Sequence, residues 1–459
     1  MKVGFISLGC SKNLVDTEMM IGLFEKNKLE IVSNPADAEI ILINTCGFIE
    51  RAKQEAIDTI LEMVEYKKEK CKYLIVTGCL VQRYKNELQQ ELPEVDLFIS
   101  IDEYEQFWNR IQSLLTKNKS ELDKTQKLSD SKLSTNLNKE ISNKKSMQQL
   151  DYLNRKITTS GYYAYLKIAE GCSNNCTYCA IPKIRGPYIS RKMEEILEEA
   201  NKLSDAGVQE LIVIAQDTTK YGVDLYGESK LAELLKQLCR MNFKWIRFLY
   251  SYPETITDEL IKTVRDEEKI CKYFDIPMQH ISDPVLKRMG RRSTSDTIRR
   301  VVKNIRKEIP DVVLRTTFIT GFPGETEEQF EELKEFVKET KFDRLGVFAY
   351  SKEDGTPAVK LDGHMKASIK KARANEIMKI QNKISRENNE ILIGKELEVL
   401  IENITDDGEY YIGRSTREVP DDTDGVVFVK NTKDLIIGDF VKVKIEKALD
   451  YDIVTTIIE

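Results

Sequence analysis

The chain has 459 residues, of which 41% are hydrophobic and 32% are charged, and its formal net charge is −6. This length is too great for one ordinary core and predicts about three domains. No apolar run approaches the roughly 20 residues of a membrane span, and the short apolar run at 3–8 predicts a first strand rather than a secretory signal. The net negative charge gives no general attraction to nucleic acid, and nine cysteines, an odd number, favour the reducing cytoplasm and metal ligation over a disulfide scaffold.

Residues 1–116 alternate short apolar runs with stretches of helical periodicity. The runs at 3–8, 39–43, 73–77 and 95–99 predict strands, and apolar residues from Ala52 to Val64 recur at helical spacing. Strands that alternate with helices predict a doubly wound parallel sheet. We therefore expect an N-terminal α/β domain over 1–116.

Three of these predicted strands each end at a cysteine: Cys10, Cys46 and Cys79. We call these three residues the strand-end triad. The ends of parallel strands lie close together at one edge of a sheet, so the three thiols are expected to converge on one site. Glycines beside them would let the backbone turn tightly; they are Gly9, Gly47 and Gly78. The alternative is that each cysteine is a small buried hydrophobe, as we expect for Cys71, Cys239 and Cys271.

Residues 117–157 differ sharply in composition from the rest of the chain. Lys, Asn, Ser and Gln occupy 21 of the 34 positions from 117 to 150, and this stretch contains no aromatic residue, Gly or Pro. Such a segment buries too little apolar surface to offset the entropy lost on ordering. We therefore expect a polar linker or insert over 117–157.

A second strand–helix alternation runs through residues 158–389. Strand-like runs lie near 163–169, 210–215, 245–250, 273–278, 312–319 and 344–350, and a long polar helix is expected at about 366–390. Thr326 and Gln329 form a capping box that predicts the start of a helix. Six βα units predict an open, partial (β/α)6 barrel, whose active site would lie beyond the carboxyl ends of its strands.

A loop at that position has the sequence GCSNNCTYC, residues 171–179, and holds Cys172, Cys176 and Cys179, which we call the loop triad. Soft thiolates suit iron–sulfur clusters, and three of them leave one iron of a four-iron cluster without a protein ligand. An open metal position indicates a reaction, because structural sites are closed. The alternatives are a zinc site completed from a distance and three unrelated buried thiols.

Residues 390–459 alternate apolar and polar residues between turn signals at 406–408 and 438–439, which predicts a small antiparallel β-barrel. They contain 17 Asp and Glu against 8 Lys and Arg, a net of −9. An RNA-binding module is expected to be basic, so this charge favours docking of a basic protein. We expect Asp421, Asp422 and Asp424, after Pro420, to lie in a turn that tolerates charge reversal.

These features together resemble the methylthiotransferases, a family with an N-terminal triple-cysteine domain, a radical S-adenosylmethionine (SAM) domain and a C-terminal TRAM barrel. The loop triad resembles the radical-SAM signature, including the aromatic Tyr178 before its third cysteine. The runs SLGCSKNLVD at 7–16, AQDTT at 215–219, FAYSKEDGTP at 348–357 and DGVVF at 424–428 resemble the RimO branch. The resemblance covers nearly the whole chain except 117–157.

The resemblance implies two [4Fe-4S] clusters and SAM as cofactors, with the loop triad holding the SAM-binding cluster and the strand-end triad holding the auxiliary cluster. It implies reductive cleavage of SAM to a radical that abstracts hydrogen from the β-carbon of an aspartate in the small-subunit ribosomal protein S-twelve. The auxiliary cluster would then deliver a methylated sulfur to that carbon. The implied partners are ribosomal protein S-twelve or the small ribosomal subunit, and an electron donor such as flavodoxin or ferredoxin, with no role for a membrane or DNA.

Other residues carry weaker signals. Tyr178 is a candidate SAM contact, and Gln216, which ends the second barrel strand, is a candidate SAM or substrate contact. Asp217 either shares that role or caps a loop. Residues 321–325 follow a strand and open a helix, a place from which they would shape the SAM pocket, but their spacing departs by one residue from the glycine–glutamate motif of many radical-SAM proteins. His280, alone at a strand end, is expected to be structural.

Two other functions are compatible with the sequence. A tRNA adenosine methylthiotransferase would share the clusters but bind RNA, which the acidic C-terminal region disfavours. A non-enzymatic iron–sulfur electron carrier with a binding module would need no six-unit barrel. We therefore predict an enzyme of the cytoplasm that modifies a ribosomal protein.

Overall fold

The computed structural model describes residues 1–116, 150–420 and 423–458, so most of the predicted polar linker lies outside the described residues. The chain forms two compact units. The first comprises residues 1–158 together with 180–186, and the second comprises 159–179 together with 187–459. A short segment directly after the loop triad thus belongs to the first unit.

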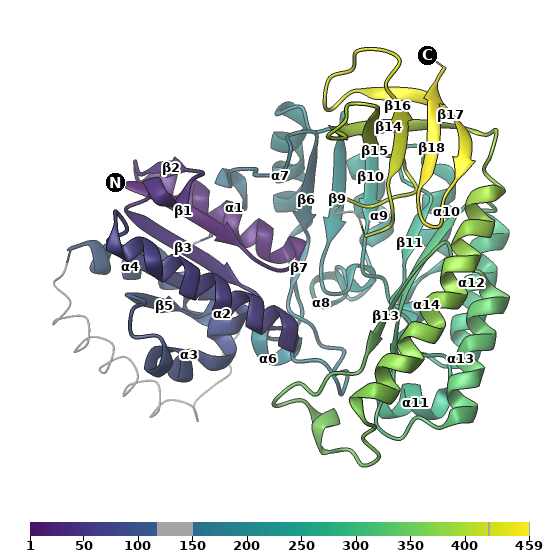
Figure 1. The fold of residues 1–459 in the computed structure, drawn as a ribbon, viewed down its shortest axis with the longest axis horizontal. Coiled ribbons are helices and arrows are strands. Elements are labelled where there is room, and N and C mark those ends of the chain that lie inside the picture. Colours follow the sequence, from purple (N-terminus) through teal and green to yellow (C-terminus); the bar gives the residue numbers. More distant parts are fainter. Residues whose placement is uncertain (117–149, 421–422, 459) are drawn as a thin grey trace. The chain divides into compact units, whose positions relative to one another are not determined.

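The first unit is built on a five-stranded sheet whose neighbouring strands all run parallel, in the order β2-β1-β3-β4-β5 (Figure 1). Its strands are β1 (Lys2–Ser7), β2 (Glu30–Val32), β3 (Ile40–Thr45), β4 (Tyr73–Gly78) and β5 (Leu97–Ile99). Its helices are α1 (Ser11–Lys26), α2 (Glu50–Glu65), α3 (Cys79–Glu91), α4 (Phe107–Thr116) and the short α6 (Ile181–Arg185). The doubly wound parallel sheet predicted from the sequence is confirmed.

The burial of each strand in this sheet explains whether the strand could be predicted from the sequence. All six residues of β3 are buried, which accounts for its uninterrupted apolar run. The helix α2 turns Ala56 and Ile60 into the core, whereas Leu61 is exposed despite its apolar character. The edge strand β2 was not predicted, because it has three residues and none of them is buried.

Residues 150–158, which include the end of the expected linker, pack against α1. The side chain of Leu150 is buried, and Arg155 forms an ion pair with Glu18, with Nη1 2.7 Å from Oε2. The backbone N–H of Thr158 donates to Oε1 of the same glutamate at 2.8 Å. At Gly22 a Cβ would lie 1.9 Å from the carbonyl oxygen of Asn154, so only glycine permits this close approach.

The second unit contains six parallel strands that follow one another in chain order (Figure 1). They are β6 (Tyr163–Lys167), β9 (Glu210–Ile214), β10 (Trp245–Phe248), β11 (Tyr273–Asp275), β12 (Val313–Thr320) and β13 (Arg344–Ala349). They form two three-stranded sheets, β6-β9-β10 and β11-β12-β13. The sheets adjoin where the N–H of Ser251 donates to the carbonyl of Asp275 at 2.8 Å. The predicted partial (β/α)6 barrel is confirmed, and each of its strands lies where the sequence places it.

Helices accompany these strands. They are α7 (Met193–Asp205), α8 (Val223–Tyr226), α9 (Leu231–Cys239), α10 (Asp258–Asp266), α11 (Asp283–Arg288), α12 (Ser295–Glu308), α13 (Glu327–Thr340) and α14 (Ala367–Glu390), and a two-stranded ribbon pairs β7 (Ala169–Glu170) with β8 (Ile189–Ser190). The capping box at Thr326 and Gln329 is present, with both reciprocal hydrogen bonds formed. The apolar face of α13 is buried through Phe330, Leu333 and Phe336, as its periodicity predicts.

The chain ends in a closed barrel with strand order β14-β15-β16-β18-β17. The strands are β14 (Glu396–Ile404), β15 (Tyr410–Arg414), β16 (Val427–Lys430), β17 (Phe440–Ala448) and β18 (Ile453–Ile457). In β17, buried Val441, Val443 and Ile445 alternate with exposed lysines, which gives the period of two seen in the sequence. The predicted small β-barrel is confirmed.

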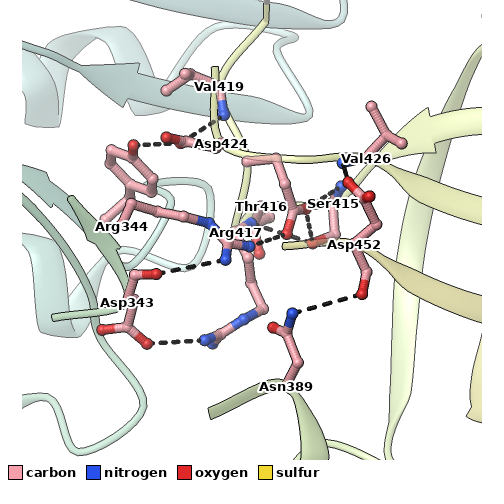
Figure 2. A network of polar contacts seen from close by, with 12 residues as sticks. Asp343, Arg344, Asn389, Ser415, Thr416, Arg417, Val419, Asp424, Val426 and Asp452 are labelled. Atoms are coloured by element: carbon pink, nitrogen blue, oxygen red, sulfur yellow. Dashed lines mark hydrogen bonds and ion pairs between the residues drawn. The ribbon is translucent and has the colours of Figure 1, made fainter. Parts of the chain in front are cut away.

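A buried polar network joins this barrel to the strands that precede it (Figure 2). Arg344 at the start of β13 donates from Nη2 to Oε1 of Glu418 at 2.8 Å, and both side chains are buried. Asp424 accepts from the hydroxyl of Tyr273 at 2.5 Å and lies 3.4 Å from Nε of Arg315. The expectation that Asp424 occupies a tolerant exposed turn is therefore wrong, because its carboxylate is buried among hydrogen-bond donors. Residues 421–422 lie outside the described part of the chain.

Among the described helices, none combines the length and the apolar character that crossing a membrane requires.

Candidate metal centres

The structure places the strand-end triad where three strands give way to helices. Cys10 immediately precedes α1, Cys46 directly follows β3, and Cys79 is the first residue of α3 after β4. Each thiol lies within electrostatic range of the other two. The three strand ends that carry these cysteines therefore lie near one another in the first unit, and the convergence of the thiols on one metal site stays a prediction.

Glycines lie where the three cysteine-bearing segments approach one another most closely. A Cβ on Gly9 would lie 2.7 Å from Cβ of Cys46, and a Cβ on Gly47 would lie 2.6 Å from Cα of Leu80, the neighbour of Cys79. Gly9 also has φ +93°, which side chains rarely adopt. The absence of a side chain at these positions lets the three loops approach one another.

Asn13, in the first turn of α1, ties these segments together through its side chain. Its Nδ2 donates to the carbonyl of Leu8 at 2.8 Å and to the carbonyl of Thr45 at 3.0 Å. Those carbonyls lie on the approach to Cys10 and next to Cys46. Its Oδ1 lies 3.7 Å from the sulfur of Cys79. One amide therefore contacts all three segments that carry the triad.

Arg185, the last residue of α6, brings a positive charge to the same place. Its Nη1 lies 2.6 Å from Oδ2 of Asp16, and its Nη2 donates to Oδ1 of Asn13 at 2.6 Å. The same Nη2 lies 3.7 Å from the sulfur of Cys79. The Arg185 and Asp16 side chains are 1% and 0% exposed, so this ion pair is screened from water.

The surroundings of the three thiols shift their pKa values in different directions. Partial loss of water around the thiol acts to raise the pKa of Cys10, which is an exposed residue, but the charges of Lys12 and Arg185 and nearby backbone N–H groups outweigh this effect and hold that pKa below the ordinary value of 9.0. Burial raises the pKa of Cys46, and it raises the pKa of Cys79 to about 11. Without a metal, Cys10 is thus the thiol of the triad that ionises most easily.

The loop triad lies in the second unit, on the loop that follows β7. Cys172 and Cys176 are buried and Cys179 is partly buried, and the N–H of Cys179 donates to the carbonyl of Cys176 at 3.1 Å. Asn175 has φ 54°, a left-handed conformation that asparagine tolerates better than most residues. Burial raises the pKa of Cys172. The tight turn presents three sulfurs from eight consecutive residues.

Side chains from neighbouring strand ends hold this loop in place. Asn174 donates from Nδ2 to Oδ2 of Asp217 at 2.8 Å, and Asp217 also accepts from Oγ1 of Thr219 at 2.7 Å. Burial raises the pKa of Asp217. The N–H of Thr177 donates to the carbonyl of Met289 at 2.9 Å. Of the two roles considered for Asp217, these contacts show the loop-holding one.

A second buried arginine lies beside the loop triad. Nη1 of Arg291 is 4.0 Å from the sulfur of Cys176, and its guanidinium lies over the ring of Tyr252, 4.2 Å from the centroid. Its Nε is buried and has no hydrogen-bond partner among the described residues. Tyr178 lies near the same groups, packs edge-on against Phe322, and has a pKa raised well above its ordinary value by burial.

The chemistry of both triads fits iron–sulfur clusters. Within the described ranges, no three His, Cys, Asp or Glu side chains are grouped so as to hold a metal ion. Thiolates that bind different irons of one cluster need not converge on a single point, however, and a sulfur-only donor set is the one such clusters use. Each triad also has a buried arginine near one sulfur, Arg185 at Cys79 and Arg291 at Cys176. A buried cation at each site suits an anionic group bound to the thiols.

The remaining candidates have different surroundings. Gln216 follows β9, is partly buried, and makes no side-chain hydrogen bond to another described residue, which leaves its amide available for a ligand. His280 is fully buried, accepts from the N–H of Ser282 at Nδ1, and lies 3.6 Å from Glu325 through Nε2. Glu325 in turn accepts from the N–H of Gly321 at 2.9 Å. Glu325 thus holds the 321–325 turn through backbone N–H groups, and Nε2 of His280 lies beside its carboxylate without a hydrogen-bond partner among the described residues.

Sequence patterns do not reveal the polar residues around the triads. Asn13 was seen only as part of a longer run, and Arg185 and Arg291 gave no signal. The only local indication for Asn13 and Asp16 is that they follow Cys10 on the first turns of a helix, on its buried face. Arg185 is 172 positions from its partner Asn13, a distance at which no periodicity operates.

Comparison with known proteins assigns families to three stretches of the chain. Residues 2–100 match the uncharacterized protein family UPF0004, residues 166–337 match the radical SAM superfamily, and residues 393–458 match the TRAM domain. Among solved structures, the radical S-adenosylmethionine methyltransferase TsrM from Kitasatospora setae aligns with a TM-score of 0.57. The alignment covers 78% of this chain and 76% of TsrM at 12% identity, which shows a shared fold alone.

Curated relatives match over almost the full length. The ribosomal protein uS12 methylthiotransferase RimO of Alkaliphilus oremlandii (strain OhILAs) is 59% identical, and the match covers 99% of this chain and 98% of the relative. The protein of the same description from Clostridioides difficile (strain 630) is 48% identical, again over 99% of this chain and 98% of the relative. On this identity the chain belongs to the RimO family of ribosomal protein uS12 methylthiotransferases and is a radical-SAM sulfur transferase.

Proposed function

We propose that this protein transfers a methylthio group to the β-carbon of an aspartate in ribosomal protein uS12. The observation that carries the proposal is the presence of two three-cysteine sites in a chain that matches RimO relatives over 99% of its length. One site suits radical generation and the other suits sulfur supply, which are the two tasks that this reaction combines.

In this proposal the loop triad, Cys172, Cys176 and Cys179, holds a [4Fe-4S] cluster that binds SAM, and the strand-end triad, Cys10, Cys46 and Cys79, holds a second cluster. When bound, these groups supply the electron, the radical and the methylated sulfur. Three protein ligands leave one iron of each cluster open for an exogenous ligand.

The chain's own residues position and shield these groups. Asp217 holds Asn174 and so keeps the loop triad in its turn. Arg291, buried beside Cys176, balances negative charge that would otherwise be costly to bury. Gln216 and Tyr178 are the proposed contacts to SAM or substrate, because the Gln216 amide makes no hydrogen bond to another residue that the structure describes and Tyr178 lies near Cys176 and Cys179.

The charge of the C-terminal barrel supports a basic protein substrate rather than RNA. Part of the net charge of −9 is internal, since Glu418 and Asp424 are buried in ion pairs and Glu402 binds Arg414 at 2.8 Å. Other acidic residues are exposed, including Asp406, Asp407 and Glu409. Phosphate backbones are repelled by such a surface, whereas ribosomal proteins rich in lysine and arginine are attracted.

The proposed setting follows from the substrate. The reaction takes place in the cytoplasm on free uS12 or on the small ribosomal subunit, and involves neither a membrane nor DNA. The electron is proposed to come from a small carrier such as flavodoxin or ferredoxin.

Mass spectrometry of ribosomal proteins and tRNA tests the proposal in cells. In a strain that lacks this protein, uS12 is expected to lose the mass of one methylthio group while tRNA keeps its modifications. Complementation with the wild type should restore the group, and Cys172→Ala should not. If uS12 is unchanged and a tRNA adenosine loses a methylthio group, the proposal is wrong and the protein acts on tRNA.

A further inference from the structure

The segment that follows the loop triad connects the two cysteine sites through the chain itself. Cys179 is its last cysteine, and Arg185 comes six residues later at the end of α6. Residues 180–186 nevertheless belong to the first compact unit, where α6 packs against α3, the helix that begins at Cys79. A residue that adjoins one triad in sequence therefore lies beside the other triad in space.

The contacts of Arg185 are directional and enclosed. Its guanidinium uses Nη1 for Asp16 and Nη2 for Asn13, each at 2.6 Å, and Nη2 also lies 3.7 Å from the sulfur of Cys79. Charge-assisted hydrogen bonds of this length, formed by buried groups, fix the positions of both partners. An arginine in this place is costly to bury unless it is paired, and Asp16 supplies the opposite charge.

Asn13, held by Arg185, in turn fixes the segments that carry the other two cysteines, Cys10 and Cys46. Its Nδ2 holds the carbonyls of Leu8 and Thr45, which precede Cys10 and Cys46, and its own backbone carbonyl accepts from Nδ2 of Asn44 at 2.9 Å. A change in the orientation of the Asn13 amide would therefore move two of the segments that carry the triad and remove one of the two polar contacts of the Cys79 sulfur.

We propose that Arg185 is a positioning residue for the strand-end triad: it orients Asn13, which aligns the three cysteine-bearing segments, and it places a fixed positive charge next to Cys79. This inference rests on the proposed function for the existence of a cluster at that triad. Arg185 lies six positions after Cys179 in the sequence, and all of its contacts named above are with residues of the first unit.

The fixed charge has a measurable consequence. A cation near an iron–sulfur cluster stabilises the reduced state, which carries one more negative charge, and hydrogen bonds toward the sulfurs act in the same direction. Loss of the guanidinium should therefore make the cluster at the strand-end triad harder to reduce and easier to lose.

The test uses the full chain with Cys172, Cys176 and Cys179 replaced by Ala, so that only the strand-end triad can bind a cluster. In this background we compare Arg185→Met, Arg185→Lys and the control Arg155→Met. Arg155 forms an equally buried ion pair with Glu18 on the same helix, with side chains 2% and 3% exposed. Reduction potential, the electron paramagnetic resonance spectrum of the reduced cluster and iron retention are measured for each variant, together with thermal unfolding of the metal-free proteins.

We expect Arg185→Met to shift the potential to more negative values and to weaken iron retention about 10- to 100-fold, the range for groups that orient metal ligands. Arg185→Lys should recover the reduction potential in part, because lysine restores the positive charge but cannot bind Asp16 and Asn13 with two separate nitrogens. Arg155→Met should lower thermal stability and leave the potential and spectrum unchanged. If Arg185→Met does not fold, Arg185→Lys provides the test. An Arg185→Lys protein with the wild-type reduction potential and normal iron retention would overturn the positioning role.

A purely structural role predicts that both Met variants lose stability alike and that the cluster which remains has its original potential, and this result would overturn the inference. Failure of the proposed function looks different. In that case the background protein with an intact strand-end triad takes up no iron at all, whichever residue occupies position 185.

Discussion

At the scale of single residues, the loop triad depends on a hydrogen bond to the neighbouring strand. Asp217 follows β9 and holds the side chain of Asn174 at 2.8 Å, between the first two cysteines of the loop. Its carboxylate is fully buried and is also satisfied by Thr219. The loop has no regular secondary structure of its own over 171–177, so such side-chain contacts set its shape.

Replacement of Asp217 by Ala is therefore expected to loosen the loop triad. Iron held by that triad should be lost about tenfold more readily, because the loop ligands are no longer oriented. Asp224→Ala is the control, because Asp224 is an exposed carboxylate of the same unit whose described hydrogen bonds go to Ser190 and not to residues 171–179. Timed iron release to a chelator measures the effect. Equal release from both variants would contradict this role for Asp217.

At the scale of elements, the C-terminal barrel is fixed to the strands of the (β/α)6 barrel by buried ion pairs. Arg247 on β10 donates to Oε1 of Glu210 on β9 at 2.9 Å and to the carbonyl of Thr416 at 3.0 Å. Figure 2 shows Asp343 and Arg344 facing the segment from Ser415 to Val419. Buried pairs of this kind add little net stability, but removal of one partner leaves an uncompensated charge.

The charge reversal Asp424→Lys is expected to destabilise the barrel by about 3–5 kcal/mol, because it buries a cation beside Arg315 and Arg344. Asp406→Lys, at the exposed turn between β14 and β15, should change the free energy of unfolding by no more than about 0.5 kcal/mol. Trp245 packs against Phe440 of the barrel with ring centroids 4.8 Å apart, so its fluorescence in a Trp108→Phe background reports this contact. Similar urea midpoints for the two variants would contradict the burial of Asp424.

Glu418 gives the barrel a predictable pH dependence. Although its burial acts to raise the pKa, Arg344 and the hydroxyl and N–H of Ser415 hold it below the ordinary value of 4.5. A lowered carboxyl pKa adds stability above pH 4.5 and loses it as the pH falls through the lowered value. Glu418→Gln should therefore be less stable than the wild type at pH 7, and this difference should shrink on acidification below pH 4.5. A difference that stays constant from pH 7 to pH 3 would contradict the ion pair.

The elements themselves were largely predictable, because periodicity and turn residues are local signals. All six strands of the (β/α)6 barrel and the capping box of α13 follow from such patterns. What escaped prediction depends on contacts between distant residues. Asp424 lies in a polar stretch after Pro420 that has the composition of a turn. Its carboxylate is nevertheless buried and accepts a hydrogen bond from Tyr273, which is 151 positions away. Arg185 was missed for the same reason, since its partners are on α1.

At the scale of the whole molecule, the two cysteine triads are expected to act independently in binding and jointly in the reaction. Anaerobically reconstituted protein should hold about eight irons, and replacement of the loop triad by Ala should leave about four. Replacement of the strand-end triad by Ala should preserve reductive cleavage of SAM and abolish sulfur transfer. Iron analysis and quantification of 5′-deoxyadenosine measure both. Complete loss of iron from either variant, or no cleavage by a folded strand-end variant, would contradict this division.

The most direct test of the account is a single reaction in which two substrates compete. The reconstituted protein is incubated anaerobically with SAM, a reductant, a sulfide source, unmodified uS12 in the small ribosomal subunit and unmodified tRNA, and both substrates are analysed by mass spectrometry. We expect uS12 to gain one methylthio group on an aspartate, tRNA to remain unchanged, and rising salt to slow the reaction as the acidic barrel is screened. Methylthiolation of a tRNA adenosine, with uS12 unmodified, would contradict the central claim.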